Sequence, residues 1–220
     1  IAREVGVGNL EQVKKIVRQA LAFAFVGGLG LSLCVEALSG YIPVWLGAEP
    51  AVVDRAVLYL RIISAAFLFN TLVAFCGGIL RGAGDTRTPL ICNILANIVH
   101  IGGNFFLIFP TRQVEIGKYC FTVWGAGLGV AGAGLSTALS FTMCALVLLA
   151  VVFFRPSKVQ ISIKGDYRPD RRILHQAWLL GSPAGYERLI LSSGQLVVTK
   201  MVAGLGNTAL AAYYLTNTAE

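Results

Sequence analysis

Long runs of apolar residues, separated by short polar segments, are the dominant pattern along this chain. A helix needs about 20 apolar residues to cross a bilayer, whereas a barrel strand needs about 10 alternating ones. The runs here have the first length, and in hydrocarbon their backbone groups must be satisfied internally, so we expect helices. The pattern predicts five membrane-spanning helices and the start of a sixth, at 16–42, 52–79, 89–109, 128–154, 173–203 and from 208 onward.

The overall composition supports this prediction. Of the 220 residues, 56% are hydrophobic and 13% are charged. A soluble domain of this size has about a quarter of its residues charged. We therefore expect an all-α, polytopic transmembrane helical bundle in a lipid bilayer.

The net charge of +7 follows the expected topology. Twelve basic residues lie in the N-terminal stretch and after the second and fourth spans: Arg3, Lys14, Lys15, Arg18, Arg81, Arg87, Arg155, Lys158, Lys164, Arg168, Arg171 and Arg172. The alternate connectors hold three: Arg55, Arg112 and Lys118. Because basic loops stay in the cytoplasm, we expect the N-terminal segment and the loops 80–88 and 155–172 to be cytoplasmic. The charge thus reports topology, and we expect no nucleic-acid partner.

The third span carries a stripe of polar side chains. Asn93, Asn97, His100 and Asn104 are spaced by 4, 3 and 4 residues, which places them within roughly 60° on a helical wheel. An unpaired amide or imidazole facing lipid would cost several kcal/mol, so the stripe must face a partner helix or a wet cavity. Hydrogen bonds between helices would explain one or two asparagines. Four residues in register, one of them titratable near neutral pH, favour a cavity wall.

Two further spans carry candidate binding residues. The fourth opens with closely spaced small residues from Gly125 to Gly134, which let another helix approach and bring Thr137 within reach of the stripe. In the fifth, Glu187 lies one to two turns inside the membrane, where a carboxylate needs a partner. Glu187 is either part of a structural ion pair or part of a cation or proton site. Glu36 is interpreted as an interfacial residue.

The loop from Leu80 to Pro89 is short and rich in glycine and charge. It lacks the spacing of a phosphate-binding loop and no strand precedes it, so a tight turn between helices fits better. Asp85 can pair there with Arg81 or Arg87. The chain shows no Cys-x-x-Cys and no Cys/His cluster with metal spacing, and we expect neither a metal site nor a cofactor.

These segments together resemble the multidrug and toxic compound extrusion (MATE) family. The string Leu80 to Pro89, running into Asn93, Asn97 and Asn104, is similar to that family's junction between helices four and five. The stretches 129–137, 181–187 and 205–212 are similar to the starts of helices six to eight. Because the chain begins without methionine and ends within an apolar segment, we expect an excerpt from a longer protein.

The resemblance implies twelve helices in two lobes. Residues 1–154 would be helices three to six of the N-terminal lobe, 155–172 the cytoplasmic linker, and 173–220 helix seven and a truncated helix eight. It also implies a secondary active antiporter in the plasma or inner membrane, without an ATP site. Such a protein would export organic cations or amphipathic drugs in exchange for H⁺ or Na⁺, and we expect the full-length transporter to be monomeric.

The resemblance also places an ion site. In some members, polar residues of helices five and six help to bind the ion, and by position these fall on His100, Asn104 and Thr137. Asn104 stands where those members have an aspartate, which puts a sodium site of that type in doubt and favours protons or coupling in the second lobe. The site residues expected here are Asn97, His100, Asn104, Thr137 and Glu187.

Two alternatives belong to other functional classes. A lipid-linked precursor flippase of the same superfamily usually needs a more cationic central cavity, and Arg188 is the basic residue that we place deep in a span. A membrane enzyme would need paired carboxylates, a metal cluster or a nucleophile with its base, and the spans show none of these. We expect no enzymatic activity.

Overall fold

The computed structural model describes residues 1–116, 119–162, 165 and 167–219. Lys118 and Lys164, which belong to the charge pattern above, and Glu220 lie outside these residues. The described elements are α1 (Ala2–Val7), α2 (Leu10–Leu38), α3 (Ile42–Trp45), α4 (Pro50–Gly82), α5 (Arg87–Leu107), β1 (Pro110–Ile116), β2 (Tyr119–Ala126), α6 (Val130–Phe154), α7 (Arg171–Ala203) and α8 (Asn207–Ala219). The expected all-α class is confirmed, with one short hairpin added.

Four described helices, α2, α4, α5 and α6, are long and apolar enough to cross a membrane. They correspond to the first four expected spans, and the chain is a multi-pass membrane protein. The fifth expected span also forms a helix, α7, but its polar residues keep it below the apolar level of the other four. The sixth forms α8, which is 13 residues long.

The chain divides into two compact units. Unit 1 comprises residues 1–37 and 58–168, and unit 2 comprises residues 38–57 and 169–220. Each is described by itself. The division into lobes and linker that the resemblance implies stays a prediction.

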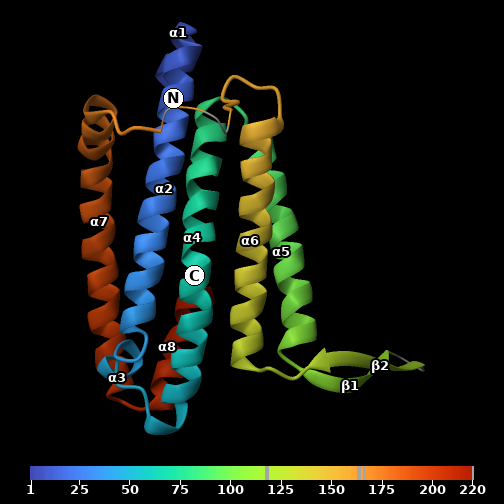
Figure 1. The fold of residues 1–220 in the computed structure, drawn as a ribbon. Coiled ribbons are helices and arrows are strands. Elements are labelled where there is room, and N and C mark those ends of the chain that lie inside the picture. The colour runs from blue at the N-terminus through green and yellow to red at the C-terminus, as the bar shows by residue number, and fades with distance from the viewer. Residues whose placement is uncertain (117–118, 163–164, 166, 220) are drawn as a thin grey trace. The chain divides into compact units, whose positions relative to one another are not determined.

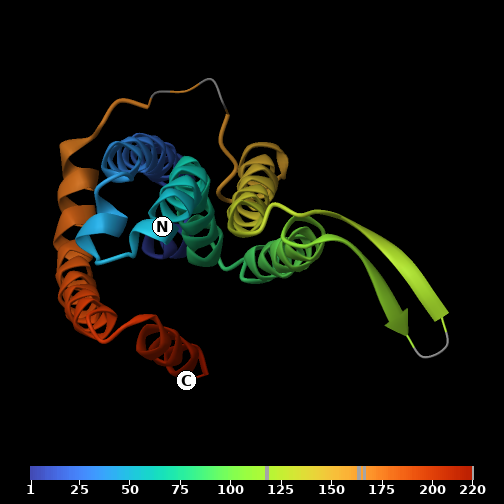
Figure 2. The same ribbon diagram turned by 90° about the horizontal axis from the view of Figure 1, so that it is seen from below.

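Unit 1 is a layer of helices in which α2, α4, α6 and α5 lie side by side in that order (Figures 1 and 2). Its core collects small and branched side chains from all four helices, such as Val17, Cys76, Ala96 and Leu148. The segment after α6 closes one end of this core, because Val159 and Ile161 are almost fully buried.

The three basic segments meet at one end of unit 1. The Cβ and Cγ2 atoms of Ile1 lie next to Gly82, and the amide of Gln19 donates a 3.0 Å hydrogen bond to the carbonyl of Arg168. Arg155, after α6, pairs with Asp85 of the α4–α5 turn. This shared end is what an alternating topology with basic loops on one side requires. That this side is cytoplasmic stays a prediction.

A β-hairpin joins α5 to α6, where the sequence analysis expected only a connector. Strands β1 and β2 are antiparallel, with Val114 opposite Phe121 and an irregularity next to Pro110. The hairpin projects away from the helices (Figure 2). At its base the guanidinium of Arg112 lies 4.5 Å and 4.2 Å from the ring centres of Phe105 and Phe109.

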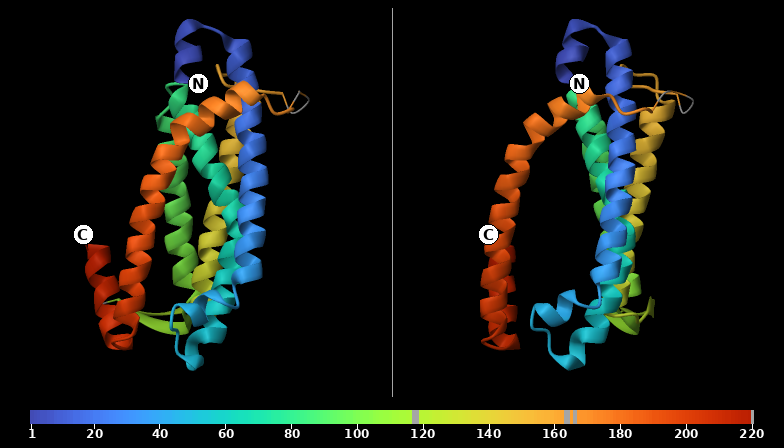
Figure 3. Two further views of the ribbon diagram at one scale, coloured as in Figure 1. Left: turned by 90° about the vertical axis from the view of Figure 1, so that its left-hand side faces the viewer. Right: turned by 60° about the vertical axis from the view of Figure 1, so that its left-hand side comes forward.

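Unit 2 contains α3, α7 and α8, and α8 turns back beside the end of α7 (Figure 3). Helix α7 begins at Asp170, whose side chain accepts a 2.9 Å hydrogen bond from the backbone N–H of Arg172 and so caps the helix. Pro183 lies inside the helix, which remains one continuous element. The ammonium of Lys200 lies 4.5 Å from the ring centre of Trp45.

Candidate functional site

Helices α5 and α6 approach each other closely because both present glycine at the contact. A Cβ atom at Gly132 would lie 2.5 Å from the carbonyl oxygen of Leu107. A Cβ atom at Gly103 would collide with the hydroxyl of Ser136. These small residues allow the backbones to meet, which brings the polar side chains of the two helices within hydrogen-bonding distance.

Three of the predicted site residues come together at this contact. The Nε2 atom of His100 lies 3.1 Å from Oγ1 of Thr137 and 3.3 Å from Nδ2 of Asn104. The hydroxyl of Ser136 donates a 2.8 Å hydrogen bond to the backbone carbonyl of His100, which ties the two helices at the same level. We refer to His100, Asn104 and Thr137 as the polar cluster.

No single tautomer of His100 satisfies both side-chain contacts of its Nε2 atom. The hydroxyl of Thr137 donates to the carbonyl of Ala133 at 2.9 Å, so its oxygen is left to accept a hydrogen bond from an N–H of His100. The amide nitrogen of Asn104 is a donor and requires a bare nitrogen on His100 instead. The tautomer with a proton on Nε2 therefore has Thr137 as its hydrogen-bond partner, and the tautomer with a bare Nε2 has Asn104.

Burial leaves one group of the polar cluster unsatisfied. Among the described residues, the Oδ1 atom of Asn104 is buried and has no hydrogen-bond partner. His100, Asn104 and Thr137 are all half-buried. An unpaired carbonyl in an apolar layer costs about 1–3 kcal/mol. The cluster is thus not fully bonded, because one buried acceptor has no partner among the described residues.

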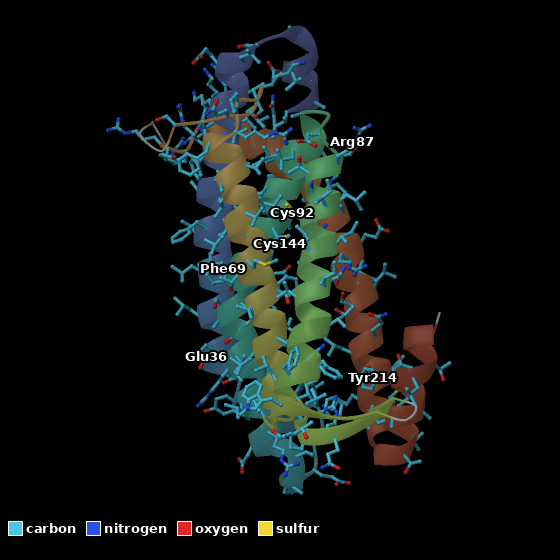
Figure 4. The ribbon with its side chains drawn as sticks, turned by 90° about the vertical axis from the view of Figure 1, so that its right-hand side faces the viewer. Glu36, Phe69, Arg87, Cys92, Cys144 and Tyr214 are labelled. Carbon is cyan, nitrogen blue, oxygen red and sulfur yellow. The ribbon has the colours of Figure 1, made fainter. Side chains whose placement is uncertain are left out.

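The rest of the stripe on α5 behaves differently. Asn93 accepts a 3.7 Å contact from the thiol of Cys144, and Figure 4 places Cys92 on α5 and Cys144 on α6 at nearly the same level. Asn97 is exposed on the surface of unit 1 and is not joined to the polar cluster. The stripe therefore contacts α6 at Asn93 and His100, and both Asn93 and Asn97 are exposed.

Glu187 is not brought to the polar cluster by the structure of either unit. It lies on α7 in unit 2, where its side chain is exposed, whereas His100, Asn104 and Thr137 belong to unit 1. A role for Glu187 as a cation or proton site stays a prediction.

A second polar group, which the sequence analysis missed, joins α2 to α4. The carboxylate of Glu36 lies 3.6 Å from Nε of Arg61, and its other oxygen accepts a 2.5 Å hydrogen bond from the buried hydroxyl of Ser64. The interpretation of Glu36 as an interfacial residue stays a prediction, and the structure adds that Glu36 is paired within the protein. Arg61 is also a basic residue inside a span, in addition to Arg188, and its position eleven residues into α4 was the available signal.

A third polar group lies outside the spans, in the α4–α5 turn. Asp85 accepts hydrogen bonds from the backbone N–H of Thr88 at 3.0 Å and from its hydroxyl at 2.6 Å, and pairs with Arg155 at 3.1 Å. The hydroxyl of Thr88, helped by its N–H and by Arg155, holds the pKa of Asp85 below its usual value. The ion-pair partner is Arg155, not the side chain of Arg81 or Arg87 as expected, because the end of α6 reaches this turn.

Within the part of the chain that the structure describes, no group of three or more His, Cys, Asp or Glu side chains is arranged to hold a metal ion.

Comparison with known proteins identifies the relatives of this chain. The MatE family model matches residues 1–106. A protein named "Probable multidrug resistance protein NorM" from Thermotoga maritima is 28% identical over 213 residues, covering 97% of this chain and 43% of that protein. "Probable multidrug resistance protein YoeA" from Bacillus subtilis is 26% identical over 219 residues, covering 99% and 45%. The chain thus spans less than half the length of these relatives.

The three-dimensional fold is also similar to those of solved transporter structures. A solved structure described as the inward-facing conformation of a multidrug resistance MATE family transporter of the MOP superfamily aligns with a TM-score of 0.81 at 22% identity, covering 97% of this chain and 45% of that one. A MOP superfamily transporter from Pyrococcus furiosus aligns with a TM-score of 0.77 at 22% identity. The family model, the similarity to relatives along nearly the whole chain and the shared fold agree, and the chain is a multi-pass membrane protein similar to members of the MatE family.

Proposed function

We propose that this chain is part of a secondary active antiporter that exports organic cations or amphipathic drugs in exchange for an inorganic cation. The match to the MatE family model and the multidrug-resistance names of the relatives support this activity. Because the chain spans 43–45% of those relatives, the activity is proposed for the full-length protein in the plasma membrane.

The observation that carries the proposal is the polar cluster between α5 and α6. It lies within two helices that are apolar enough to span the membrane, and its buried Asn104 oxygen has no partner among the described residues. Polar groups at this depth are costly unless they face protein or water. A cluster that serves packing alone would be more stable if Oδ1 of Asn104 accepted a hydrogen bond. A site on an ion pathway, in contrast, requires an acceptor that the protein itself does not occupy.

We further propose that the coupling ion at this cluster is a proton. His100 is its only ionisable side chain, and histidine changes charge near neutral pH. Na⁺ is a hard cation that prefers oxygen ligands, and a site that offers amide and hydroxyl groups without a carboxylate holds it weakly. The exchange of partners at Nε2 supplies two arrangements of the α5–α6 contact, one with a proton on Nε2 and one without.

The test is drug transport by the full-length protein in proteoliposomes, with ethidium as the probe. A proton gradient and a sodium gradient are imposed separately. We expect the proton gradient to drive ethidium exchange, and His100→Gln to remove this component. His175→Gln, a matched substitution at an exposed position on α7, should leave it unchanged. Transport driven by sodium alone, or transport unchanged in His100→Gln, would contradict proton coupling at the cluster.

The relatives reported above give no support to the flippase alternative, and it is not proposed. The family consists of transporters, so an enzymatic role is not proposed either.

A further inference from the structure

A cavity opens where the α4–α5 turn meets the end of α6, at the end of unit 1 opposite to Glu36. Its volume is about 450 Å³, more than ten times the roughly 30 Å³ that one water molecule occupies in the liquid. We call it the cationic pocket and define it by six of its lining residues: Leu80, Val151, Val159, Arg87, Arg155 and Lys158. Figure 4 shows Arg87 in the first turn of α5, at this end of the helices.

The charges around the cationic pocket do not balance. Arg87, Arg155 and Lys158 contribute three positive charges, and Asp85 contributes one negative charge. Asp85 is already engaged by Thr88 and by Arg155. Arg87 and Lys158 are exposed and form no ion pair with other described residues, so an excess of two positive charges faces the cavity.

The walls of the cationic pocket change character over a short distance. Leu80 and Val159 are almost fully buried, and Val151 is half-buried against the core, so the inner wall is apolar. Arg87 begins α5, Arg155 follows the last residue of α6, and Lys158 lies three residues further on. Both helices are long and apolar enough to span the membrane, which places the cationic side chains at the level of lipid headgroups.

We propose that the cationic pocket binds the headgroup of an anionic phospholipid. Arginine and lysine pair with phosphate oxygens, arginine in a bidentate manner. Basic pockets between membrane helices at the interface are suited to anionic headgroups. The apolar inner wall favours a lipid over a free phosphate, because a glycerol backbone and the first acyl carbons can cover Leu80 and Val151.

Binding there would join two segments of unit 1. A phosphate between Arg87 and Lys158 contacts the start of α5 and the segment after α6, which are already joined by the Asp85–Arg155 pair. The lipid thus adds a second cross-link beside an exposed ion pair that by itself contributes little. The expected result is a protein whose stability rises with the anionic lipid content of its surroundings.

The experiment measures the melting temperature of the full-length protein in detergent, titrated with dioleoylphosphatidylglycerol. Dioleoylphosphatidylcholine, inorganic phosphate and glycerol 3-phosphate are titrated in parallel. We expect a saturable rise with phosphatidylglycerol and a much smaller effect of the other three. A contribution of about 1 kcal/mol for each cation near a membrane surface corresponds to about fivefold weaker binding for each one removed. Arg87→Gln with Lys158→Gln should therefore weaken the apparent affinity about 25-fold.

The matched control removes two positive charges from the same end of the molecule without touching the pocket. Arg3 is exposed on α1, and the guanidinium of Arg81 lies beside Gly77, one turn back along α4. Arg3→Gln with Arg81→Gln should keep the response to phosphatidylglycerol. If the pocket double variant does not fold, Arg87→Gln and Lys158→Gln are measured singly, each with about a fivefold loss expected.

Three results would overturn the proposal. The first is an equal response of the pocket variant and the parent protein to phosphatidylglycerol. The second is an equal response of the parent protein to phosphatidylcholine. The third is a response to inorganic phosphate or glycerol 3-phosphate as large as that to the lipid, which would make the pocket a site for a soluble anion.

Discussion

Two contacts within unit 1 join neighbouring helices through polar side chains, and they satisfy those side chains in different ways. Between α2 and α4, the negative Glu36 is matched by the positive Arg61 and receives the hydroxyl of Ser64. Between α5 and α6, the polar cluster is uncharged as long as His100 is neutral, and Asn104 keeps an unpaired oxygen.

The difference distinguishes a structural joint from a candidate working site. A charge pair has little freedom to change protonation, because losing either charge leaves the other one unpaired within a helix that spans the membrane. A neutral cluster around an imidazole can gain a proton and change hydrogen-bond partners at a smaller cost. The α5–α6 contact is therefore the better candidate for a proton-dependent change, and the α2–α4 contact for holding unit 1 together.

The largest expected effect comes from separating the helices at the polar cluster. Gly132→Ala places a Cβ atom 2.5 Å from the carbonyl oxygen of Leu107, so the backbones must move apart. We expect a loss of about 2–3 kcal/mol in the free energy of unfolding, measured by denaturation in detergent. At Gly28 on α2 the nearest backbone atom, the Cα of Leu68, would be 3.1 Å away, and we expect a loss of about 1 kcal/mol for alanine.

Gly102→Ala is the control for both substitutions. A Cβ atom at Gly102 meets nothing within 4 Å, although this residue is adjacent to Gly103 in the tight contact. Alanine has a higher helix propensity than glycine by about 1 kcal/mol, so this variant should be neutral or more stable. A loss at Gly102 as large as that at Gly132 would show that the tight contact is not the cause.

The charged joint between α2 and α4 should respond to a double-mutant cycle. Glu36→Gln leaves Arg61 without its carboxylate, and we expect a loss of about 1 kcal/mol, because both side chains are about half exposed. Arg61→Gln should cost a similar amount. The double variant should be more stable than the sum of the single losses predicts, since no unpaired charge remains. Strictly additive losses would mean that the pair does not couple the helices.

A substitution in the polar cluster should reduce proton-driven transport while leaving the free energy of unfolding nearly unchanged. Asn104→Leu removes the buried oxygen that has no partner, so its effect on the free energy of unfolding should stay within about 1 kcal/mol of zero. The same change removes a hydrogen-bond partner of His100, and we expect the proton-driven component of transport to fall. Normal proton-driven transport in Asn104→Leu would mean that Asn104 serves packing alone. The control for packing is Ser140→Ala, which changes a buried residue one turn beyond the cluster on α6.

The sequence was sufficient to find the helices and much of the polar cluster. A polar stripe with helical spacing on α5 and a small-residue start of α6 correctly brought His100, Asn104 and Thr137 together. The spacing also grouped Asn97 with them, yet Asn97 is exposed, whereas the cluster residues are half-buried. Helical periodicity defines a face about 60° wide, and only the rotation of α6 against α5 decides which residues of that face are covered.

The features that the sequence analysis missed depend on pairing across the fold. Glu36 and Arg61 each look like an isolated charge within an apolar run, and their contact depends on the register of α2 against α4. The ion pair between Asp85 and Arg155 likewise depends on where α6 ends. The β-hairpin could have been predicted from the sequence, because apolar residues such as Val114 and Ile116 alternate with polar ones before the turn. The 17 residues that form it were instead interpreted as a loop.

The smallest expected effect tests whether a similar pair outside the membrane contributes to stability. The Asp85–Arg155 pair lies in the α4–α5 turn, where water screens it, so Asp85→Asn should cost less than about 1 kcal/mol at pH 7. Since the hydroxyl of Thr88 and, to a smaller extent, Arg155 hold the pKa of Asp85 below its unfolded value, the contribution is fully present above the unfolded pKa of about 3.9. It is lost as the pH falls through the lower folded pKa.

Urea denaturation of the parent protein and of Asp85→Asn between pH 7 and pH 3 measures this difference. The two stabilities should differ slightly but constantly down to about pH 4 and converge below it. Thr88→Val removes the hydroxyl that donates to Asp85 and should move the convergence to a higher pH, since the folded pKa then lies nearer its usual value. A difference that grows as the pH falls would mean that the carboxylate destabilises the turn, and the contrast between paired charges inside and outside the membrane would then need another cause.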